Sequence, residues 1–243
     1  MKKIGKKIFP FIIVFTIMSM FTTSLLSNAA STDLESFSSN YSTNSMQTLQ
    51  GDDGYSLFKV GRSGTQTYMT FQNQTSTNNY VVLTVSAISS SGTIMNTNSY
   101  SGILPSGNVH ALMNNNPNAV SFQVAAVMYS NSMLSNWTAV VDNTSTIQAS
   151  DSKSLAIVTR SSNVAYLSLK NRTSSAHYYD INIDAISSSG SNVGNTNANG
   201  ILPANTIDTI LNMSSADTYQ FAAQMWNNTT PTGTLLSNWT ATA

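Results

Sequence analysis

Apolar and polar residues alternate with a period of two along most of this chain. Between residues 79 and 89, for example, every second residue from Val81 to Ala87 is apolar. Other segments place apolar residues on one face in the same way: Met69 and Phe71; Phe122, Val124, Ala126 and Met128; Leu167 and Leu169; Tyr179, Ile181, Ile183 and Ala185; Tyr219, Phe221, Ala223 and Met225. Alternation over such lengths predicts β-strands with one buried face. No window favours a helix of normal length.

Several motifs occur twice. The sequence Ala-Ile-Ser-Ser-Ser-Gly stands at 87–92 and 185–190, Gly-Ile-Leu-Pro at 102–105 and 200–203, and Leu-Ser-Asn-Trp-Thr-Ala at 134–139 and 236–241. The two copies run from Ser56 to Asn143 and from Ser154 to Ala243, and the second copy carries an insertion around Asn228 to Gly233. Self-similarity over this length indicates an internal duplication.

Turn-forming residues separate the alternating segments into about seven strands per copy. In the first copy we expect strands at 56–61, 66–73, 79–89, 93–97, 107–114, 120–129 and 135–142, with equivalents in the second. The Leu-Pro turn before a strand resembles hairpin entries in bacterial immunoglobulin-like modules. The sequence therefore predicts an all-β protein of two tandem immunoglobulin-like or fibronectin-III-like β-sandwich modules.

The N-terminal residues have the pattern of a secretory signal. Four lysines precede an apolar run from Phe11 to Phe21, and Ser27-Asn28-Ala29 supplies small residues before a cleavage point. The run is too short for a spanning helix. We expect a signal peptide at 1–29, a flexible polar leader at 30–54, module 1 at 55–143, a linker at 144–153 and module 2 at 154–243, with no transmembrane segment in the mature chain.

Charge and cysteine content narrow the class of protein. Four of the ten basic residues lie in the expected signal peptide, so six remain against ten acidic residues, a net charge of −4. This balance argues against nucleic acid as a partner. The chain has no cysteine and therefore no disulfide bonds. Exported proteins without disulfides are more typical of Gram-positive bacteria, so we expect an origin there. We expect a secreted, extracellular protein and leave non-covalent association with the cell surface open.

Nothing in the sequence resembles a catalytic constellation. His110 and His177 have no counterpart in the other copy, and no Gly-x-Ser-x-Gly elbow is present. We interpret both histidines as ordinary surface residues, and predict no enzyme activity and no cofactor.

The segment Asp180-Ile-Asn-Ile-Asp184 has the ligand spacing of a calcium loop but not its glycine or its final glutamate. We expect it to be the solvent face of a strand and predict no metal site from side chains. Calcium binding by backbone carbonyls of the loops stays an open alternative.

The aromatic residues supply the one candidate binding site. Trp137 and Trp239 are equivalent and are expected in the core, whereas Trp226 falls on the outward side of its strand, with Tyr129 as its counterpart. An outward aromatic beside a polar loop is suited to stacking on a ligand. The predicted ligand-binding residues are Trp226, Tyr129, Asn227 and Asn228.

One cation is repeated as well. Arg62 and Arg160 are equivalent, and we expect each to bind loop carbonyls of its own module or to stack on Tyr68 and Tyr166.

Three functions remain. The leading hypothesis is a secreted, non-enzymatic bacterial protein that acts as a surface, matrix or interaction module, with self-association through exposed strand edges. The alternative is a glycan-binding or cell-wall-binding protein that uses outward aromatics. A further alternative is a membrane-active β toxin.

Overall fold

The computed structural model describes residues 47–142, 146–161 and 163–243, all of which belong to one unit of the chain, Asp33–Ala243. The expected signal peptide and residues 30–46 of the expected leader lie outside the described residues. In the first copy the strands are β1 (Gln47–Asp52), β2 (Ser56–Ser63), β3 (Gln66–Asn73), β4 (Asn79–Ile88), β5 (Ile94–Leu104), β6 (Val109–Asn115), β7 (Ser121–Tyr129) and β8 (Met133–Asp142).

The second copy has the same succession of strands. They are β9 (Thr146–Ser150), β10 (Ser154–Ser161), β11 (Val164–Asn171), β12 (His177–Ile186), β13 (Asn192–Leu202), β14 (Ile207–Asn212), β15 (Thr218–Trp226) and β16 (Leu235–Thr242). No described segment forms a helix long and apolar enough to cross a membrane. The predicted all-β class is confirmed.

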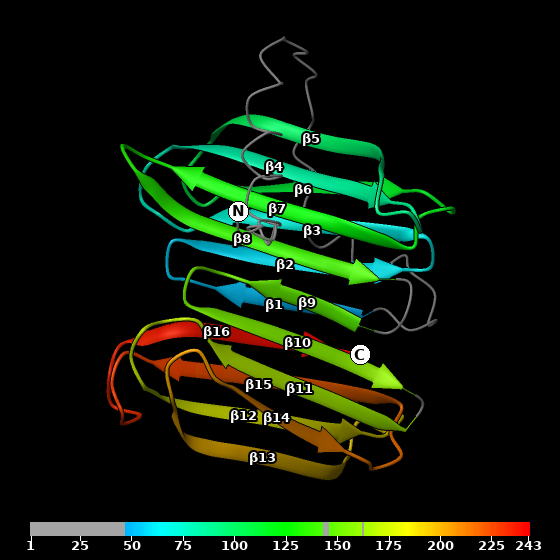
Figure 1. The fold of residues 1–243 in the computed structure, drawn as a ribbon, viewed down its shortest axis with the longest axis vertical. Coiled ribbons are helices and arrows are strands. Elements are labelled where there is room, and N and C mark those ends of the chain that lie inside the picture. Colours follow the sequence, from blue (N-terminus) through cyan, green and yellow to red (C-terminus); the bar gives the residue numbers. More distant parts are fainter. Residues whose placement is uncertain (1–46, 143–145, 162) are drawn as a thin grey trace, which may run out of the picture. The chain divides into compact units, whose positions relative to one another are not determined.

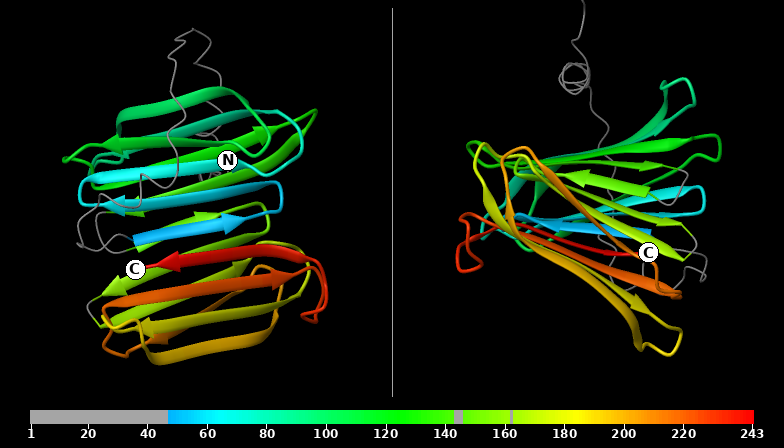
Figure 2. Two further views of the ribbon diagram at one scale, coloured as in Figure 1. Left: turned by 180° about the vertical axis from the view of Figure 1, so that it is seen from behind. Right: turned by 60° about the horizontal axis from the view of Figure 1, so that its bottom comes forward.

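The strands form two antiparallel sheets that lie face to face (Figures 1 and 2). Sheet A has the order β13-β12-β15-β16-β1-β2-β3-β6, and sheet B has the order β14-β11-β10-β9-β8-β7-β4-β5. Each sheet therefore takes four strands from each copy. The strand order of the first copy recurs in the second with every number raised by eight.

Each copy contributes one β-sandwich module. In the first copy β2, β3 and β6 lie in one sheet and β8, β7, β4 and β5 in the other, which is the three-on-four order of a fibronectin-III-like sandwich. These seven strands are the seven that the alternation predicted. β5 is longer than the expected 93–97 and extends to Leu104.

Two additional strands join the modules. β1 pairs with β16 from Thr48↔Thr242 to Asp52↔Asn238, and β9 pairs with β8 from Thr138↔Ser150 to Val141↔Ile147. Residues 47–52 fall within the expected flexible leader and residues 146–150 within the expected linker, but both segments form strands. These short polar-rich segments form strands because each has a neighbouring strand on both sides and buries apolar residues: Leu49 in β1, and Ile147 and Ala149 in β9.

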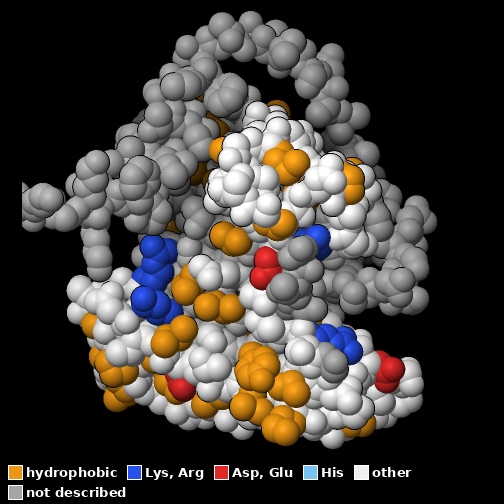
Figure 3. Space-filling view, turned by 45° about the vertical axis from the view of Figure 1, so that its right-hand side comes forward, with side chains coloured by type: hydrophobic (Ala, Val, Ile, Leu, Met, Phe, Trp, Pro, Cys, Tyr) orange, Lys and Arg blue, Asp and Glu red, His pale blue; other side chains and the backbone are white. Residues whose placement is uncertain are grey.

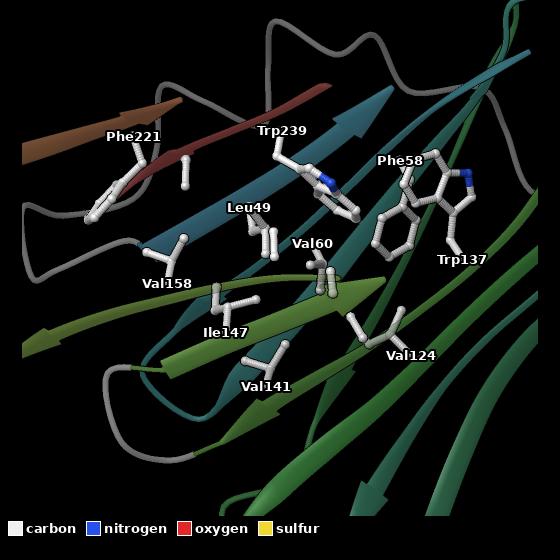
Figure 4. Close-up of a cluster of buried hydrophobic side chains, with 14 of the residues drawn as sticks. Leu49, Phe58, Val60, Val124, Trp137, Val141, Ile147, Val158, Phe221 and Trp239 are labelled. Atoms are coloured by element: carbon white, nitrogen blue, oxygen red, sulfur yellow. The ribbon is translucent and has the colours of Figure 1, made fainter. Parts of the chain in front are cut away.

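A single hydrophobic core runs through both modules. Trp137 and Trp239 are almost fully buried, as predicted, and their rings meet edge to face with centroids 5.3 Å apart (Figure 4). Leu49 and Ile147, from the joining strands, lie in the same cluster. The two halves therefore bury apolar surface against each other, and apolar burial is the main favourable contribution to stability.

Buried polar side chains support the tryptophans identically in both halves. Trp239 donates from Nε1 to Ser154 Oγ at 2.8 Å, and Ser154 contacts Ser237 and Asp151. Trp137 makes the same 2.8 Å bond to Ser56, which contacts Ser135 and Asp53. These bonds satisfy donors that would be costly to bury alone.

The repeated sequence motifs are turns with defined chemistry. Ser-Ser-Ser-Gly closes the β4–β5 and β12–β13 hairpins, and both Gly92 and Gly190 have φ of +79°, which a residue with a side chain rarely adopts. The Asn-x-Thr motif is buried at Asn73 and Asn171, whose side chains hold the Gly-Ile-Leu-Pro turn through Leu104 and Leu202 carbonyls.

Gly51 in β1 tests the junction of the two modules. A Cβ added there would lie 2.5 Å from Trp137 Cζ3 and 2.7 Å from Trp239 Cζ3, and both rings are held by their core neighbours. We expect Gly51→Ala to lower the free energy of unfolding by about 1–3 kcal/mol through overpacking. Urea denaturation followed by far-UV circular dichroism measures it.

Gln50→Ala is the matched control, because Gln50 lies on the opposite face of the same strand and is only partly buried. The control should change stability by less than about 0.5 kcal/mol. Equal stability of Gly51→Ala and the unchanged protein would contradict the packing described at this junction.

Candidate functional site

The two predicted aromatic residues occupy equivalent positions on different sheets. Tyr129 is the last residue of β7 in sheet B, and Trp226 is the last residue of β15 in sheet A. The preceding methionines, Met128 and Met225, are fully buried, so both aromatics fall on the outer faces of their sheets, as predicted. The predicted residues therefore belong to two separate sites.

Tyr129 is part of a line of outward side chains that crosses four strands. Cross-strand pairs join Ile103 to Tyr80, Tyr80 to Tyr129, and Tyr129 to Met133. Ile103, Tyr80 and Met133 are 58%, 44% and 54% exposed, which is unusual for large apolar residues standing side by side. We call Ile103, Tyr80, Tyr129 and Met133 row 1.

The second copy has a corresponding line on sheet A. Tyr178 pairs with Ile201, Trp226 pairs with Leu235, and the rings of Tyr178 and Trp226 meet edge to face with centroids 5.5 Å apart. Ile201 and Leu235 are 56% and 40% exposed. We call Ile201, Tyr178, Trp226 and Leu235 row 2.

A β-bulge lies beside the aromatic side chain in both rows. Between Met128 and Tyr129 the pairing with β8 moves from Ser135 to Met133, and between Met225 and Trp226 the pairing with β16 moves from Ser237 to Leu235. The extra residue therefore stands on the neighbouring strand, at Leu134 in β8 and Leu236 in β16, and Met133 and Leu235 lie opposite the two aromatics. The same irregularity occurs at the equivalent place in both copies.

The rows differ in the outward side chains that lie beside them. Beside row 2, cross-strand pairs place Asn199, Asp180, Gln224 and Asn238 in a polar line. Beside row 1 the corresponding line is Ser101, Val82, Val127 and Asn136. Row 2 thus has hydrogen-bonding groups along its length, and row 1 has them only at its ends.

The polar face of β12 extends further along the strand. Ile181 and Ile183 are fully buried and Asp180, Asn182 and Asp184 face outward, as predicted. Asp184 accepts hydrogen bonds from Asn195, Asn192 and Asn182, which lower the pKa of its carboxyl group. No group of three or more histidine, aspartate or glutamate side chains is placed to hold a metal ion in the described part of the chain.

The predicted residues Asn227 and Asn228 shape the loop that follows Trp226. The Asn227 side chain accepts a hydrogen bond from the Thr234 amide at 3.0 Å, and the Asn228 side chain accepts one from the Thr230 amide at 3.3 Å. The Asn228 carbonyl also accepts the amide hydrogen of Tyr178. The loop is therefore fixed against β12 beside row 2, whereas the shorter connection after Tyr129 has no such segment.

His177 is buried, which corrects the interpretation of both histidines as surface residues. Its side chain is only 6% exposed because it lies on the inward face of β12, in the position paired with Leu202. Its Nδ1 has no hydrogen-bond partner among the described residues. Burial lowers the pKa of His177, while the carbonyls of Trp226 and Asn227 act in the opposite direction.

His110 is half-buried and stacks on Tyr100 with ring centroids 3.7 Å apart. Its counterpart Asp208 accepts a hydrogen bond from the Tyr179 hydroxyl instead. The two histidines lie in different copies and at opposite ends of sheet A, since His110 belongs to the edge strand β6 and His177 to β12. Each has a packing environment that explains its presence.

The repeated arginines act within their modules, as predicted. Arg62 donates to the carbonyls of Gly64 and Asp142, and Arg160 donates to those of Ala216 and Asp217. The guanidinium groups lie over Phe122 and Tyr219, with 5.8 and 5.2 Å to the ring centroids. Phe122 and Tyr219 were not among the aromatic partners that the sequence suggested.

Sequence reasoning did not include six members of the rows: Ile103, Tyr80 and Met133 in row 1, and Ile201, Tyr178 and Leu235 in row 2. Alternation alone places Tyr80 and Tyr178 outward, since they precede the buried Val81 and Tyr179. That signal was available. The alignment of four strands into one row depends on strand order and register, which the alternation does not contain.

No family model and no curated protein matches the chain. Similar solved structures include a red sea bream transglutaminase (11% identity, TM-score 0.27, 70% of this chain and 29% of that one) and a Bacteroides uniformis β-glucuronidase (12%, 0.25, 72% and 26%). A β-glucuronidase of glycoside hydrolase family 2 is similar at 11% identity and TM-score 0.26, over 79% of this chain and 24% of that one. The chain spans less than a third of each, and these scores carry no argument about function.

The pH dependence of stability tests the environment of His177. Because burial depresses its pKa below the ordinary 6.5, the unfolded chain binds a proton that the folded chain does not. The stabilising contribution of neutral His177 is complete above pH 6.5 and is lost as pH falls through the depressed pKa. We expect His177→Asn to flatten the fall in stability between pH 7.5 and pH 5, measured by urea denaturation at each pH.

Asparagine is the natural replacement, because the equivalent Asn79 donates to Thr75 Oγ1 at 2.6 Å and to Asn73 Oδ1 at 3.3 Å. The pKa of His110 is also lowered by burial, but His110 is present in both proteins and cancels in the difference. Parallel pH profiles for the two proteins would show that His177 titrates normally.

Proposed function

We propose that this is a secreted, non-enzymatic extracellular protein that binds extended glycan chains along rows 1 and 2. The observation that carries the proposal is the occurrence of the same four-strand line of outward side chains, centred on two aromatics, in both copies. Secretion rests on the lysine-rich and apolar pattern of residues 1–29.

The length and direction of the rows suit an extended chain. Neighbouring strands are about 4.8 Å apart, so a row across four strands is about 14 Å long. It runs across the strands on the outer face of a sheet, where a linear oligosaccharide of a few rings can lie flat. Aromatic rings present an apolar face of the kind that packs against the apolar faces of sugar rings.

The chemistry beside the rows also favours a glycan. Side-chain amides both donate and accept hydrogen bonds and a carboxylate accepts them, and Asn199, Asp180, Gln224 and Asn238 place such groups along row 2. Only 8% of the residues are charged, and Figure 3 shows one face that is mostly uncharged and polar, with hydrophobic, basic and acidic side chains scattered over it. A neutral ligand rich in hydroxyl groups matches this surface better than an ionic one.

Tryptophan fluorescence reports on row 2 alone. Trp137 and Trp239 are buried, and Trp226 is the single partly exposed tryptophan of the three. We expect acrylamide quenching of the purified protein to fall when a bound glycan covers Trp226. Soluble fragments of peptidoglycan, chitin and cellulose are the probes, and unchanged quenching with all three would count against a glycan on row 2.

Substitution of the aromatics gives the binding test. In pull-downs with insoluble peptidoglycan, chitin and cellulose, we expect Trp226→Ala to weaken binding at row 2 by about 30-fold, the loss of a central aromatic anchor worth about 2 kcal/mol. Tyr129→Ala should act likewise on row 1. Both residues are outward, so their variants should keep the circular dichroism and unfolding midpoint of the unchanged protein.

Val140→Ala is the control for a general loss of exposed apolar surface. Val140 is 42% exposed on the outer face of sheet B and lies outside row 1. It should bind as the unchanged protein does. Failure of all three glycans to retain the protein, or retention unaffected by Trp226→Ala and Tyr129→Ala together, would overturn the proposed function.

A further inference from the structure

We propose that the protein bridges two separate glycan chains, one on row 1 and one on row 2. This inference rests on the proposed function and extends it from binding to cross-linking. The observation behind it is that the two rows lie on the outer faces of different sheets of one sandwich, row 1 on sheet B and row 2 on sheet A.

The two outer faces point away from each other because the core lies between the sheets. Residues on the inner side of the same strands are buried, such as Met128 beside Tyr129 and Met225 beside Trp226. Packed sheets are about 10 Å apart, so the rows are separated by the full thickness of the sandwich. A chain lying flat on one row therefore runs along one face and does not reach the other.

The joined fold also prevents the modules from turning their rows toward one ligand. β1 pairs with β16 and β8 pairs with β9, so each sheet is continuous through both modules. The contact between Trp137 and Trp239 packs the halves against each other in the core. Two modules on a flexible linker could bind neighbouring segments of one chain, whereas this fixed arrangement directs the second site toward a different chain.

The rows remain separate in their contacts as well. The members of row 1 all come from strands of the first copy, and those of row 2 all come from the second. No residue is shared, so loss of one row leaves the other complete. Bridging thus requires both rows, while binding requires either one.

Agglutination of peptidoglycan particles, followed by light scattering, tests the inference. The unchanged protein should agglutinate the particles over a range of concentrations. The double variant Tyr80→Ala, Tyr129→Ala removes the aromatics of row 1, and Tyr178→Ala, Trp226→Ala removes those of row 2. We expect each to stay bound to the particles but to need at least about tenfold more protein for agglutination, because cross-linking by two sites is lost.

The outcomes separate bridging from binding. Binding of the unchanged protein without agglutination would overturn bridging and leave the proposed function standing, and so would agglutination by both double variants at the unchanged concentration. Complete loss of binding in one double variant would show a single site and overturn the inference. Absence of any binding to peptidoglycan, chitin or cellulose would instead overturn the proposed function.

Self-association is examined in the same experiment. Light scattering of the protein without particles gives its mass in solution, and the inference expects no larger species at the concentrations that agglutinate. A protein that assembles by itself through its outer strands would cross-link particles with one row per molecule. The agglutination would then arise from assembly, and bridging by a single molecule would be wrong.

Discussion

The pairing of β1 with β16 and of β8 with β9 connects the two modules, and most other features of the structure depend on it. Each pairing continues a sheet from one module into the other, so four strands of the first copy and four of the second share every sheet. One hydrophobic core results in place of two small ones. A larger core buries a greater share of the chain's surface, and the chain has no cysteine with which to form disulfides.

The two tryptophans show how the junction specifies its own geometry. Their rings meet in the core, Gly51 leaves the space that both ring edges occupy, and each indole nitrogen has a serine hydroxyl within its own half. Asp151 lies behind one of these serines, and burial raises the pKa of its carboxyl group against the effect of its backbone hydrogen bonds. The same tryptophans thus pack their rings together and have their indole N–H groups hydrogen-bonded. Both interactions favour one arrangement of the modules over others.

The rows place the proposed function on the outside of this shared scaffold. Tyr80 and Tyr178 are identical in the two copies, as are Ile103 and Ile201, while the other positions differ in residue type but not in register. The polar line beside row 2 and the loop after Trp226 belong to the second copy alone. The two sites therefore share one backbone design and differ in the hydrogen bonds that they offer a ligand.

The seven strands of each sandwich module, their buried faces and the turns between them could be predicted from the sequence, because a period of two and residues such as Gly92 are local properties. The sequence also placed Trp226 and Tyr129 outward for the same reason. That residues 47–52 and 146–150 form strands follows from tertiary contacts. Residues 47–52 pair with a strand far along the chain, as Thr48 does with Thr242, and residues 146–150 lie between β8 of the first copy and β10 of the second, where Ile147 and Ala149 enter the shared core. The rows, the burial of His177 and the placing of Trp226 and Tyr129 on opposite faces follow likewise from strand order and register, which are set by non-local contacts.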